Sequence, residues 1–340
     1  MTAETLHVLI TMPFTDQQIE KIKSISPSLK VTAIRAHLPG EIPDDVWSKT
    51  DILYTDSVLP EPDLAPNLKW VQFHYTGIDY AINKPIMSKA GLTATTMSGA
   101  NAPQMAEYAM TMMLMLGSNI KLMVENQSKS LWPDKRWEFY KLHELRGSTV
   151  GLVGYGSINR ELARLLLPYQ VTVLAAKRDL KLLKDDGYIP AGQGDPDGDF
   201  FTRLYPIEAL KSMIKECDFV VLALPLTPGT RNLFSTDEFS AMKSSAYFID
   251  LSRGGITDLA ALKEALEKKI IAGAAVDVFP EEPLPANSPL WKVPNLIISP
   301  HVGGVSPHYN NRAVDLFCAN IQRFLENVPL FNRFDPEKGY

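Results

Sequence analysis

Residues 149–160 decide the fold of this chain and read Thr149-Val150-Gly151-Leu152-Val153-Gly154-Tyr155-Gly156-Ser157-Ile158-Asn159-Arg160. An apolar run enters a glycine turn and a helical pattern leaves it, which is typical of a dinucleotide-binding strand–turn–helix unit. Gly154 would permit the tight turn, and Gly156 would let the backbone approach a pyrophosphate. The N–H groups that open the helix would face this anion. The predicted cofactor contacts are therefore Gly154, Tyr155, Gly156, Ser157 and Ile158.

The third position of the fingerprint is Asn159, where a glycine normally allows the helix to pack closely on the strand. Glycine-rich loops taken alone are most often ordinary turns. The flanking sequence supports the prediction, because residues 161–167 have helical character and residues 170–176 have the pattern of a second strand. We therefore predict a parallel α/β unit here despite the missing glycine.

The residues after that second strand bear on which dinucleotide binds. An Asp or Glu about 20 residues beyond the glycines usually accepts hydrogen bonds from the ribose of NAD. Lys177 and Arg178 occupy this place. Two cations cannot accept those bonds but can pair with a 2′-phosphate, so the sequence favours NADP, with NAD as a weaker cofactor. The alternative is a solvated basic strand end, with Asp179 as the ribose partner.

Length and composition limit the possible classes of protein. The 340 residues suffice for about two domains, and a hydrophobic content of 45% is ordinary for a globular protein. A net charge of −5 without clustered Lys and Arg argues against a nucleic-acid or membrane partner. Cys217 and Cys318 lack a CxxC spacing, and no cluster of metal-binding residues is visible. We expect no disulfide and no metal, and a reducing, cytoplasmic compartment.

Short strands alternate with amphipathic helices in two series, which predicts an α/β protein. The expected strands are Leu6–Ile10, Leu29–Ala33, Asp51–Tyr54, Lys69–Phe73, Leu92–Thr95, then Thr149–Val153, Gln170–Ala176, Phe219–Leu224, Ala246–Leu251, Ile271–Val276 and Leu296–Ile298. Long helices are expected over Met105–Met123 and Asn310–Asn327. The Gly-, Pro- and Asp-rich segment Gly187–Phe200 is predicted to be an exposed inserted loop.

Three further segments place polar residues just after strands, where open α/β sheets bind ligands. They contain Ser252-Arg253-Gly254-Gly255, Asp277-Val278-Phe279-Pro280-Glu281-Glu282-Pro283-Leu284 and Ser299-Pro300-His301-Val302-Gly303-Gly304. With Ala-Leu-Pro-Leu-Thr-Pro-Gly-Thr at 223–230, this order resembles the D-isomer-specific 2-hydroxyacid dehydrogenases, most closely in type the NADP-dependent glyoxylate/hydroxypyruvate reductases. The resemblance covers nearly the whole chain and is strongest over residues 149–304.

The resemblance implies two Rossmann-like or flavodoxin-like domains with doubly wound parallel sheets and a cleft between them. A substrate domain would comprise residues 1–100 and 307–340, and a dinucleotide-binding domain residues 101–306. It also implies a homodimer, for which the apolar segment 105–122, with Trp132, Pro133 and Trp137 beyond it, is the expected interface.

Arg253, Glu282 and His301 make chemical sense as a catalytic set for reducing a 2-keto acid. Arg253 can fork onto two substrate oxygens, and His301 can donate or accept a proton near neutral pH. Glu282 beside the imidazole would stabilise its protonated form. Each residue taken alone also has an ordinary interpretation, as a helix-start cation, a solvated acid or a loop histidine.

The remaining expected site residues follow from the same resemblance. Further cofactor contacts are expected from Pro225, Thr230, Leu251, Ser252, Asp277, His301 and Gly303. Thr76 and Gly77 would present backbone N–H groups to the substrate carboxylate, although a plain turn after a strand is the alternative. Asn101 is a further candidate for the substrate cleft.

The sequence thus predicts an NADP-preferring enzyme that reduces a 2-keto acid, of the glyoxylate/hydroxypyruvate type or larger, to a D-2-hydroxy acid. The alternative function is a dinucleotide-sensing, corepressor-like interaction protein of the same fold. Long disordered tails suited to partner recruitment are not evident, which favours the enzyme.

Overall fold

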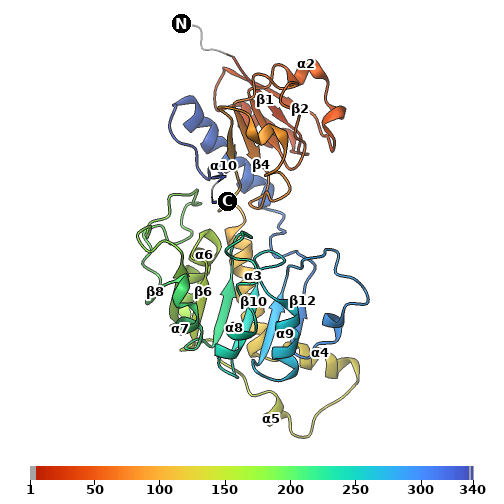
Figure 1. Ribbon diagram of the computed structural model, residues 1–340, viewed down its shortest axis with the longest axis vertical. Helices are drawn as coiled ribbons and strands as arrows, with labels where there is room; N and C mark the ends of the chain where they lie inside the picture. Colours follow the sequence, from red (N-terminus) through yellow and green to blue (C-terminus); the bar gives the residue numbers. More distant parts are fainter. Residues whose placement is uncertain (1–4, 337, 340) are drawn as a thin grey trace. The chain divides into compact units, whose positions relative to one another are not determined.

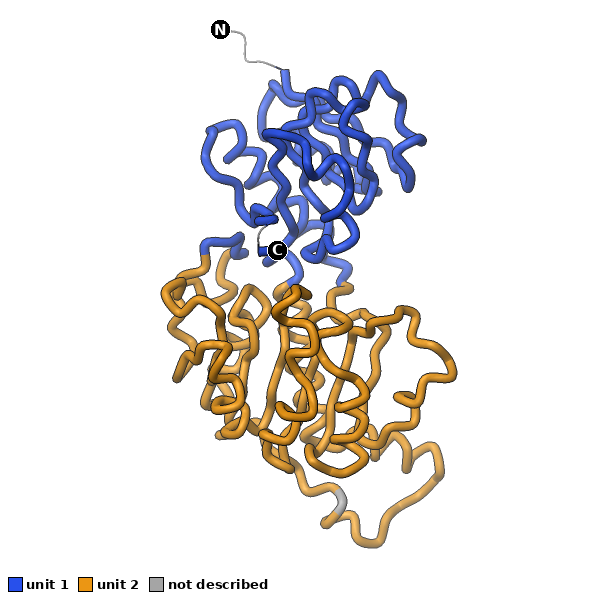
Figure 2. The backbone as a smooth tube through the Cα atoms, in the orientation of Figure 1, with its two compact units in different colours: residues 1–101, 186–190, 306–340 blue, residues 102–185, 191–305 orange. Residues whose placement is uncertain are grey.

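The computed structural model describes residues 5–336, 338 and 339. Residues 1–4, 337 and 340, which the predicted substrate domain includes, lie outside the described residues. The chain divides into two compact units (Figure 2). Unit 1 comprises Met1–Asn101, Asp186–Pro190 and Ser306–Tyr340, and unit 2 comprises Ala102–Asp185 and Ala191–Val305.

Unit 1 contains a five-stranded parallel sheet in the order β2-β1-β3-β4-β5, which is the flavodoxin-like order (Figure 1). Its strands are β1 (Leu6–Ile10), β2 (Leu29–Ala33), β3 (Ile52–Thr55), β4 (Trp70–Phe73) and β5 (Thr93–Thr95). Its helices are α1 (Asp16–Lys23), α2 (Asp44–Trp47) and α10 (Tyr309–Leu325), with short 3-10 helices at Pro39–Glu41 and Pro85–Ser88.

Successive residues of the unit 1 strands face opposite sides of the sheet, and each side has its own core. Val8 belongs to a core that includes Phe317 of α10, whereas its neighbour Leu9 belongs to a core that includes Trp47 of α2. Burial on both faces is the condition under which parallel sheets are stable. The C-terminal helix α10 therefore completes unit 1.

Unit 2 contains a seven-stranded parallel sheet in the order β12-β11-β10-β9-β6-β7-β8. Its strands are β6 (Thr149–Val153), β7 (Thr172–Lys177), β8 (Arg203–Pro206), β9 (Phe219–Leu222), β10 (Tyr247–Asp250), β11 (Gly273–Val276) and β12 (Leu296–Ile298). Its helices are α3 (Ala102–Gly117), α4 (Ile120–Ser128), α5 (Arg136–Phe139), α6 (Ser157–Leu166), α7 (Leu210–Ile214), α8 (Thr236–Ala241) and α9 (Leu259–Glu267), with 3-10 helices at Leu167–Tyr169, Ile207–Ala209 and Pro289–Lys292.

Helices cover both faces of this second sheet as well. Phe219 and Val221 of β9 belong to the core that includes α3 and α6, whereas Val220 and Leu222 belong to the core that includes α7, α8 and α9. The strand order reverses between β6 and β9, so a topological switch point lies there. The prediction of an α/β protein with doubly wound parallel sheets is confirmed.

Two details of the predicted elements are wrong. Strand β8 at the sheet edge was not predicted, because Arg203–Pro206 is short and carries no apolar run. The single helix expected over residues 105–123 is two helices, α3 ending at Gly117 and α4 beginning at Ile120. The break follows from Asn119, whose backbone is left-handed with φ 53°.

The expectation that Gly187–Phe200 is an exposed loop is also wrong in part. Residues 178–202, which join β7 to β8 and which we call the strap, contain no helix or strand but hold the fully buried Asp195. Four donors hydrogen-bond the Asp195 carboxylate, so the charge is satisfied inside the protein.

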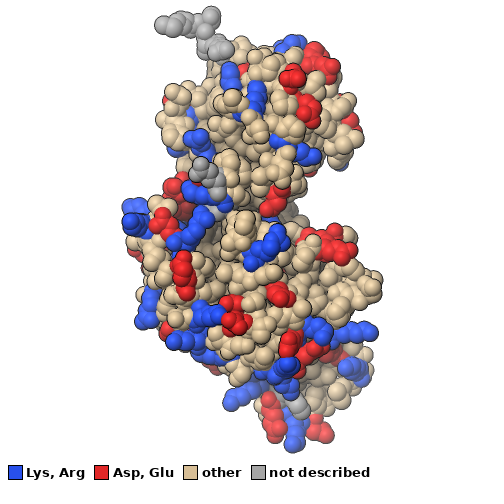
Figure 3. All heavy atoms as spheres, in the orientation of Figure 1, with Lys and Arg blue, Asp and Glu red and all other residues tan. Residues whose placement is uncertain are grey.

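On the face drawn in Figure 3, acidic and basic side chains are interspersed. Among the helices of the described ranges, none combines the length and apolarity needed to span a bilayer.

His74 lies buried at the end of β4, with 3% of its surface exposed. Its Nδ1 is 2.7 Å from the Tyr54 hydroxyl. Tyr75 and Tyr309 place their rings against the imidazole. Desolvation lowers the pKa of His74 to about 4, against a weaker opposing effect of Asp56. The imidazole is therefore neutral in folded unit 1 at physiological pH.

This burial predicts a pH-dependent stability for unit 1. In the unfolded chain His74 binds a proton below about pH 6.5, whereas in the folded chain it binds one only below about pH 4. The free energy of unfolding therefore decreases as the pH is lowered from 6.5 toward 4. Between pH 6.5 and 5.0 the loss is about 1 to 2 kcal/mol, because the full slope of about 1.4 kcal/mol per pH unit is reached only well below pH 6.5. Urea unfolding of the wild type and of His74→Gln at both pH values measures it. Equal pH dependence in the two proteins would contradict the assignment.

Candidate active site

The turn after β6 lies at the switch point of the unit 2 sheet. Gly154 has φ +86°, and a Cβ on it would lie 2.5 Å from the carbonyl oxygen of Ala223 and 2.6 Å from Leu224 Cδ2. No side chain fits in that space or favours that backbone, so this position requires glycine. The close approach sets the end of β6 directly against the segment that follows β9.

Helix α6 begins immediately after this turn. Its N-cap residue, Gly156, makes no side-chain capping bond, and a Cβ added there would meet nothing within 4 Å. Open space at the positive end of a helix suits a diphosphate, which the N–H groups of the first turn can bind. The backbone at Gly154 and the open helix start at Gly156 are the features that the sequence predicts for this turn, and its contacts to a dinucleotide stay a prediction.

Asn159 strengthens the turn instead of weakening it. The side chain is fully buried, and its Nδ2 donates to the carbonyl oxygens of Val153 at 3.2 Å and Gly154 at 2.9 Å. Its Oδ1 has no hydrogen-bond partner within the described part of the chain. In the sequence, Asn159 stands out only as a departure from the glycine fingerprint. The signal for its structural role is the short amide side chain, because Asn side chains commonly hydrogen-bond to the backbone a few residues earlier.

Lys177 and Arg178 stand at the end of β7, the strand next to β6. Lys177 is half-buried and its ammonium donates to the carbonyl oxygen of Leu182, whereas Arg178 is exposed. Asp179, the alternative ribose partner, already accepts a hydrogen bond from the Lys181 N–H through Oδ1 at 2.9 Å. The carboxylate therefore closes a local turn.

Four more predicted cofactor residues lie on adjacent loops after β9 and β10. Thr230 Oγ1 donates to the carbonyl oxygen of Pro225 at 2.7 Å. The N–H of Leu224 donates to Ser252 Oγ at 3.2 Å, and Leu251 is buried beneath. The structure thus brings the two loops together at the carboxyl edge of the sheet.

Arg253 follows directly, with its Nη1 donating to the carbonyl oxygen of Ser252 at 2.8 Å. A Cβ on the next residue, Gly254, would lie 2.0 Å from the carbonyl oxygen of Phe279. Only glycine allows this contact between the loop of Arg253 and the segment that leads to Glu282.

Glu282 and His301 form a hydrogen-bonded pair, with Glu282 Oε2 and His301 Nδ1 2.8 Å apart. The other carboxylate oxygen, Oε1, accepts from the Phe279 N–H at 2.8 Å, which fixes its orientation. Because an ionised carboxylate only accepts, Nδ1 carries the hydrogen and Nε2 is left to exchange a proton. The side chains are 36% and 45% exposed, respectively, so solvent reaches both.

Asp277 orders the loop that carries His301. It is 1% exposed and accepts from Ser299 Oγ at 2.6 Å and from the N–H groups of Val302 at 3.0 Å and Gly303 at 2.9 Å. His301 itself has φ +54°, a left-handed backbone that needs such support. From the sequence, Asp277 is expected only as a cofactor contact, and its support of the His301 loop is seen only in the structure.

The predicted carboxylate loop belongs to unit 1, whereas Arg253, Glu282 and His301 belong to unit 2. Thr76 and Gly77 follow β4 and are partly buried. Thr76 Oγ1 lies 3.5 Å from Oδ1 of Asn101, so these two predicted substrate residues are near each other.

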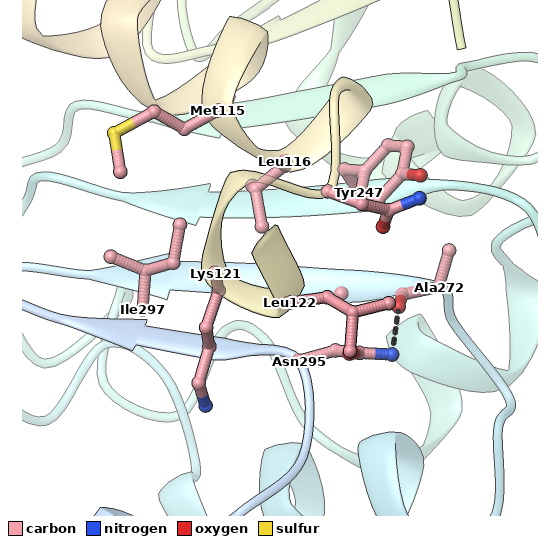
Figure 4. A pocket seen from close by; sticks show the side chains of 10 residues that line it. Met115, Leu116, Lys121, Leu122, Tyr247, Ala272, Asn295 and Ile297 are labelled. Carbon is pink, nitrogen blue, oxygen red and sulfur yellow. Dashed lines mark hydrogen bonds between the residues drawn. The ribbon is translucent and has the colours of Figure 1, made fainter. Parts of the chain in front are cut away.

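A small pocket lies elsewhere in unit 2, at the amino ends of β11 and β12 (Figure 4). Lys121 crosses it and donates to the carbonyl oxygens of Val293 and Leu296, while Asn295 Nδ2 donates to Ala272. These contacts occupy the opposite ends of the strands from Asp277 and Ser299. Among the described residues, no group of three or more His, Cys, Asp or Glu is placed to hold a metal ion.

Comparisons with known proteins identify the family of this chain. Residues 110–303 match the family model described as D-isomer specific 2-hydroxyacid dehydrogenase, NAD binding domain. The chain belongs to this family. A glyoxylate reductase of Thermofilum pendens is 33% identical over 273 residues, 79% of this chain and 76% of the relative. An (S)-sulfolactate dehydrogenase of Chromohalobacter salexigens is 32% identical, over 76% of this chain and 78% of that one.

Solved structures of the family share the fold of the whole chain. A D-isomer specific 2-hydroxyacid dehydrogenase from Xanthobacter autotrophicus, in complex with NADPH and MES, matches with TM-score 0.79 and 25% identity, covering 99% of this chain and 100% of that one. An NADPH-dependent glyoxylate/hydroxypyruvate reductase from Sinorhizobium meliloti matches with TM-score 0.77 and 25% identity over the same shares. As a family member, the protein is an oxidoreductase of 2-keto acids and 2-hydroxy acids that uses a nicotinamide dinucleotide.

Proposed function

We propose that the protein is an NADP-preferring reductase that converts a 2-keto acid into a D-2-hydroxy acid. The observation that carries the proposal is the Glu282–His301 pair, 2.8 Å apart, on the same sheet edge as the Gly154–Gly156 turn. We further infer that it works in the reducing cytoplasm, where the buried Cys217 and Cys318 stay free thiols.

The proposed chemistry divides among these residues. Bound NADPH would supply the hydride. Arg253 would bind the carboxylate and the keto oxygen of the substrate, and the N–H groups of Thr76 and Gly77 would hold the carboxylate. His301 would donate its Nε2 proton to the keto oxygen as negative charge develops there. Glu282 accepts from Nδ1 and would stabilise the imidazolium before that transfer.

Replacing His301 tests the proton donor. His301→Ala should lower kcat by about 10² to 10⁴, because general acid catalysis is worth that much. NADPH affinity should stay within a few-fold, since the imidazole acts on the substrate.

Glu282→Gln should lower kcat less than His301→Ala does. The amide oxygen can still accept a hydrogen bond from His301 Nδ1, but it carries no charge to stabilise the imidazolium. Steady-state rates and NADPH fluorescence titrations measure both effects. A His301→Ala variant retaining a tenth of the wild-type kcat would exclude the role.

The substrate class rests on the names of the relatives, which act on different acids. A glyoxylate reductase and a sulfolactate dehydrogenase share similar identity with this chain, so glyoxylate, hydroxypyruvate and larger 2-keto acids are all candidates. Following NADPH absorbance against such a panel identifies the substrate. The alternative function is a dinucleotide-sensing interaction protein. It would be favoured if the protein binds NADPH but reduces no 2-keto acid of the panel.

The preference for NADP is supported by Lys177 and Arg178 at the end of β7 and by two structural relatives solved with NADPH or NADP. Charge-assisted hydrogen bonds to a 2′-phosphate contribute about 1.5–3 kcal/mol each, so kcat/KM should favour NADPH over NADH by about tenfold to several hundredfold.

The double variant Lys177→Ala/Arg178→Ala should remove most of this preference, with Arg178 contributing more because its guanidinium can bind two oxygens. The matched control is Lys211→Ala, because Lys211 is an exposed lysine that pairs with Asp237. This variant should keep the wild-type ratio of kcat/KM for NADPH to kcat/KM for NADH. Equal use of NADH and NADPH by the wild type would refute the role of the pair.

We also propose a homodimer through the surface beyond α3. Trp132 and Trp137 are 79% and 78% exposed, and Leu131 and Val124 are more than half exposed. The Arg136 guanidinium lies 5.9 Å from the Trp132 ring and 4.5 Å from the Trp137 ring, so the two indoles are near each other, and exposed apolar patches are typical of protein interfaces. Light scattering should give twice the chain mass of 37.8 kDa, and Trp132→Ser/Trp137→Ser should shift it toward one chain. A wild-type mass of one chain at micromolar concentration would contradict the proposal.

A further inference from the structure

The strap, residues 178–202, is long for a segment without helix or strand, and such segments are usually functional. It is also folded onto itself. The N–H of Asp185 donates to the carbonyl oxygen of Pro196 at 2.9 Å. Gly198 has φ +77°, and a Cβ on it would lie 2.6 Å from the carbonyl oxygen of Leu183. These contacts hold residues 183–185 of the strap against residues 196–198.

Asp195 is the centre of this conformation. Its Oδ1 accepts from the N–H groups of Gly198 at 3.0 Å and Asp199 at 2.8 Å, and its Oδ2 accepts from the Phe200 N–H at 3.0 Å. The remaining donor comes from outside the strap. It is the hydroxyl of Tyr155, the middle residue of the glycine turn, 2.6 Å from Oδ2.

Helix α6 holds the same part of the strap from the other side. Arg160 is 2% exposed and donates to the carbonyl oxygens of Asp195 and Leu183, and its Nε lies 3.6 Å from Asp185 Oδ2. Glu161, also 2% exposed, accepts from the N–H of Gly194 at 2.6 Å. The buried Arg160 is thus satisfied by the strap, whereas the buried Glu161 accepts from the strap and also from Nε and Nη2 of Arg164, at 2.8 and 2.6 Å.

Tyr155 receives this support through its whole side chain. Its ring packs edge-on against Phe201, with centroids 5.3 Å apart, and lies 4.9 Å from the Arg160 guanidinium. The Tyr155 hydroxyl also donates a hydrogen bond to Asp195, so both ends of the side chain have partners. Tyr155, the residue between Gly154 and Gly156, is therefore held at both its ring and its hydroxyl.

The strap is fixed at a second place as well. Residues 186–190 belong to unit 1, where the N–H of Tyr188 donates to Asn332 Oδ1 at 3.1 Å and the Tyr188 ring packs edge-on against Phe331. The chain therefore leaves unit 2 and returns to it within the strap. Asp195 anchors the returning segment beside the glycine turn.

We propose that Asp195 is a positioning residue for the dinucleotide: through the Tyr155 hydroxyl it holds the Gly154–Gly156 backbone in the conformation that binds the diphosphate. The proposal rests on the dinucleotide site of unit 2 and is independent of the substrate and of the preference for NADP. Asp195 acts through the turn and touches neither substrate nor cofactor.

The test compares dissociation constants for NADPH and NADH, by fluorescence titration, among the wild type, Tyr155→Phe, Asp195→Asn and the double variant. Tyr155→Phe removes one hydroxyl and keeps the ring. It should weaken both nucleotides by about tenfold, the value of one strong hydrogen bond, with kcat at saturating cofactor within about threefold. Asp195→Asn should weaken them at least as much, and the double variant no further than Asp195→Asn.

Asp197→Asn is the matched control, because Asp197 is an exposed strap carboxylate paired with Lys184. It should bind both nucleotides within about twofold of the wild type. Nucleotide dissociation constants of Tyr155→Phe within twofold of the wild type would overturn the proposal, as would independent, multiplying effects in the double variant. Tyr155→Phe decides the matter if Asp195→Asn does not fold. Failure of the proposed reductase activity would leave these binding measurements unaffected.

Discussion

Unit 2 depends on the contact between Gly154 and the end of β9. The turn can close only because Gly154 has no side chain to meet the Ala223 carbonyl oxygen and can adopt φ +86°. Closure sets the start of α6 above the switch point of the sheet, where helix dipole and N–H groups converge. Asn159 then binds the carbonyl oxygens of the turn, and the strap packs against its middle residue.

Buried aspartates order the loops around this turn in the same way. Asp250, Asp277 and Asp195 are each nearly or fully buried, and each accepts hydrogen bonds from backbone N–H groups and hydroxyls. Such charge-assisted bonds are stronger than neutral ones, and a buried carboxylate left without them would be costly. The loops of Arg253 and His301 therefore have defined conformations although they contain little regular structure.

The sequence predicted the parts that local patterns specify and missed those that need distant partners. The glycine turn and eleven strands were expected because apolar runs and turn residues are local signals, and the Glu282–His301 contact followed from family resemblance. Asp195 was expected to be exposed to solvent, because acidic, glycine-rich segments usually form surface loops. Three of its hydrogen-bond donors follow within five residues, but the fourth, the Tyr155 hydroxyl, lies forty positions earlier in the chain. Asp277 was likewise missed as a support for His301, since its partners follow more than twenty residues later.

The division of residues between the units bears on how members of this family differ in substrate. The residues proposed for proton transfer belong to unit 2, on loops held by buried carboxylates, whereas the proposed carboxylate loop belongs to unit 1. The relatives named for glyoxylate and for sulfolactate are about equally similar to this chain, at 33% and 32% identity. Proton transfer to a keto oxygen is common to both reactions, but the substituent beside it is not. Under the proposed function, differences in substrate are to be sought in the loops of unit 1, because changes there leave the Glu282–His301 pair and the Gly154–Gly156 turn of unit 2 intact.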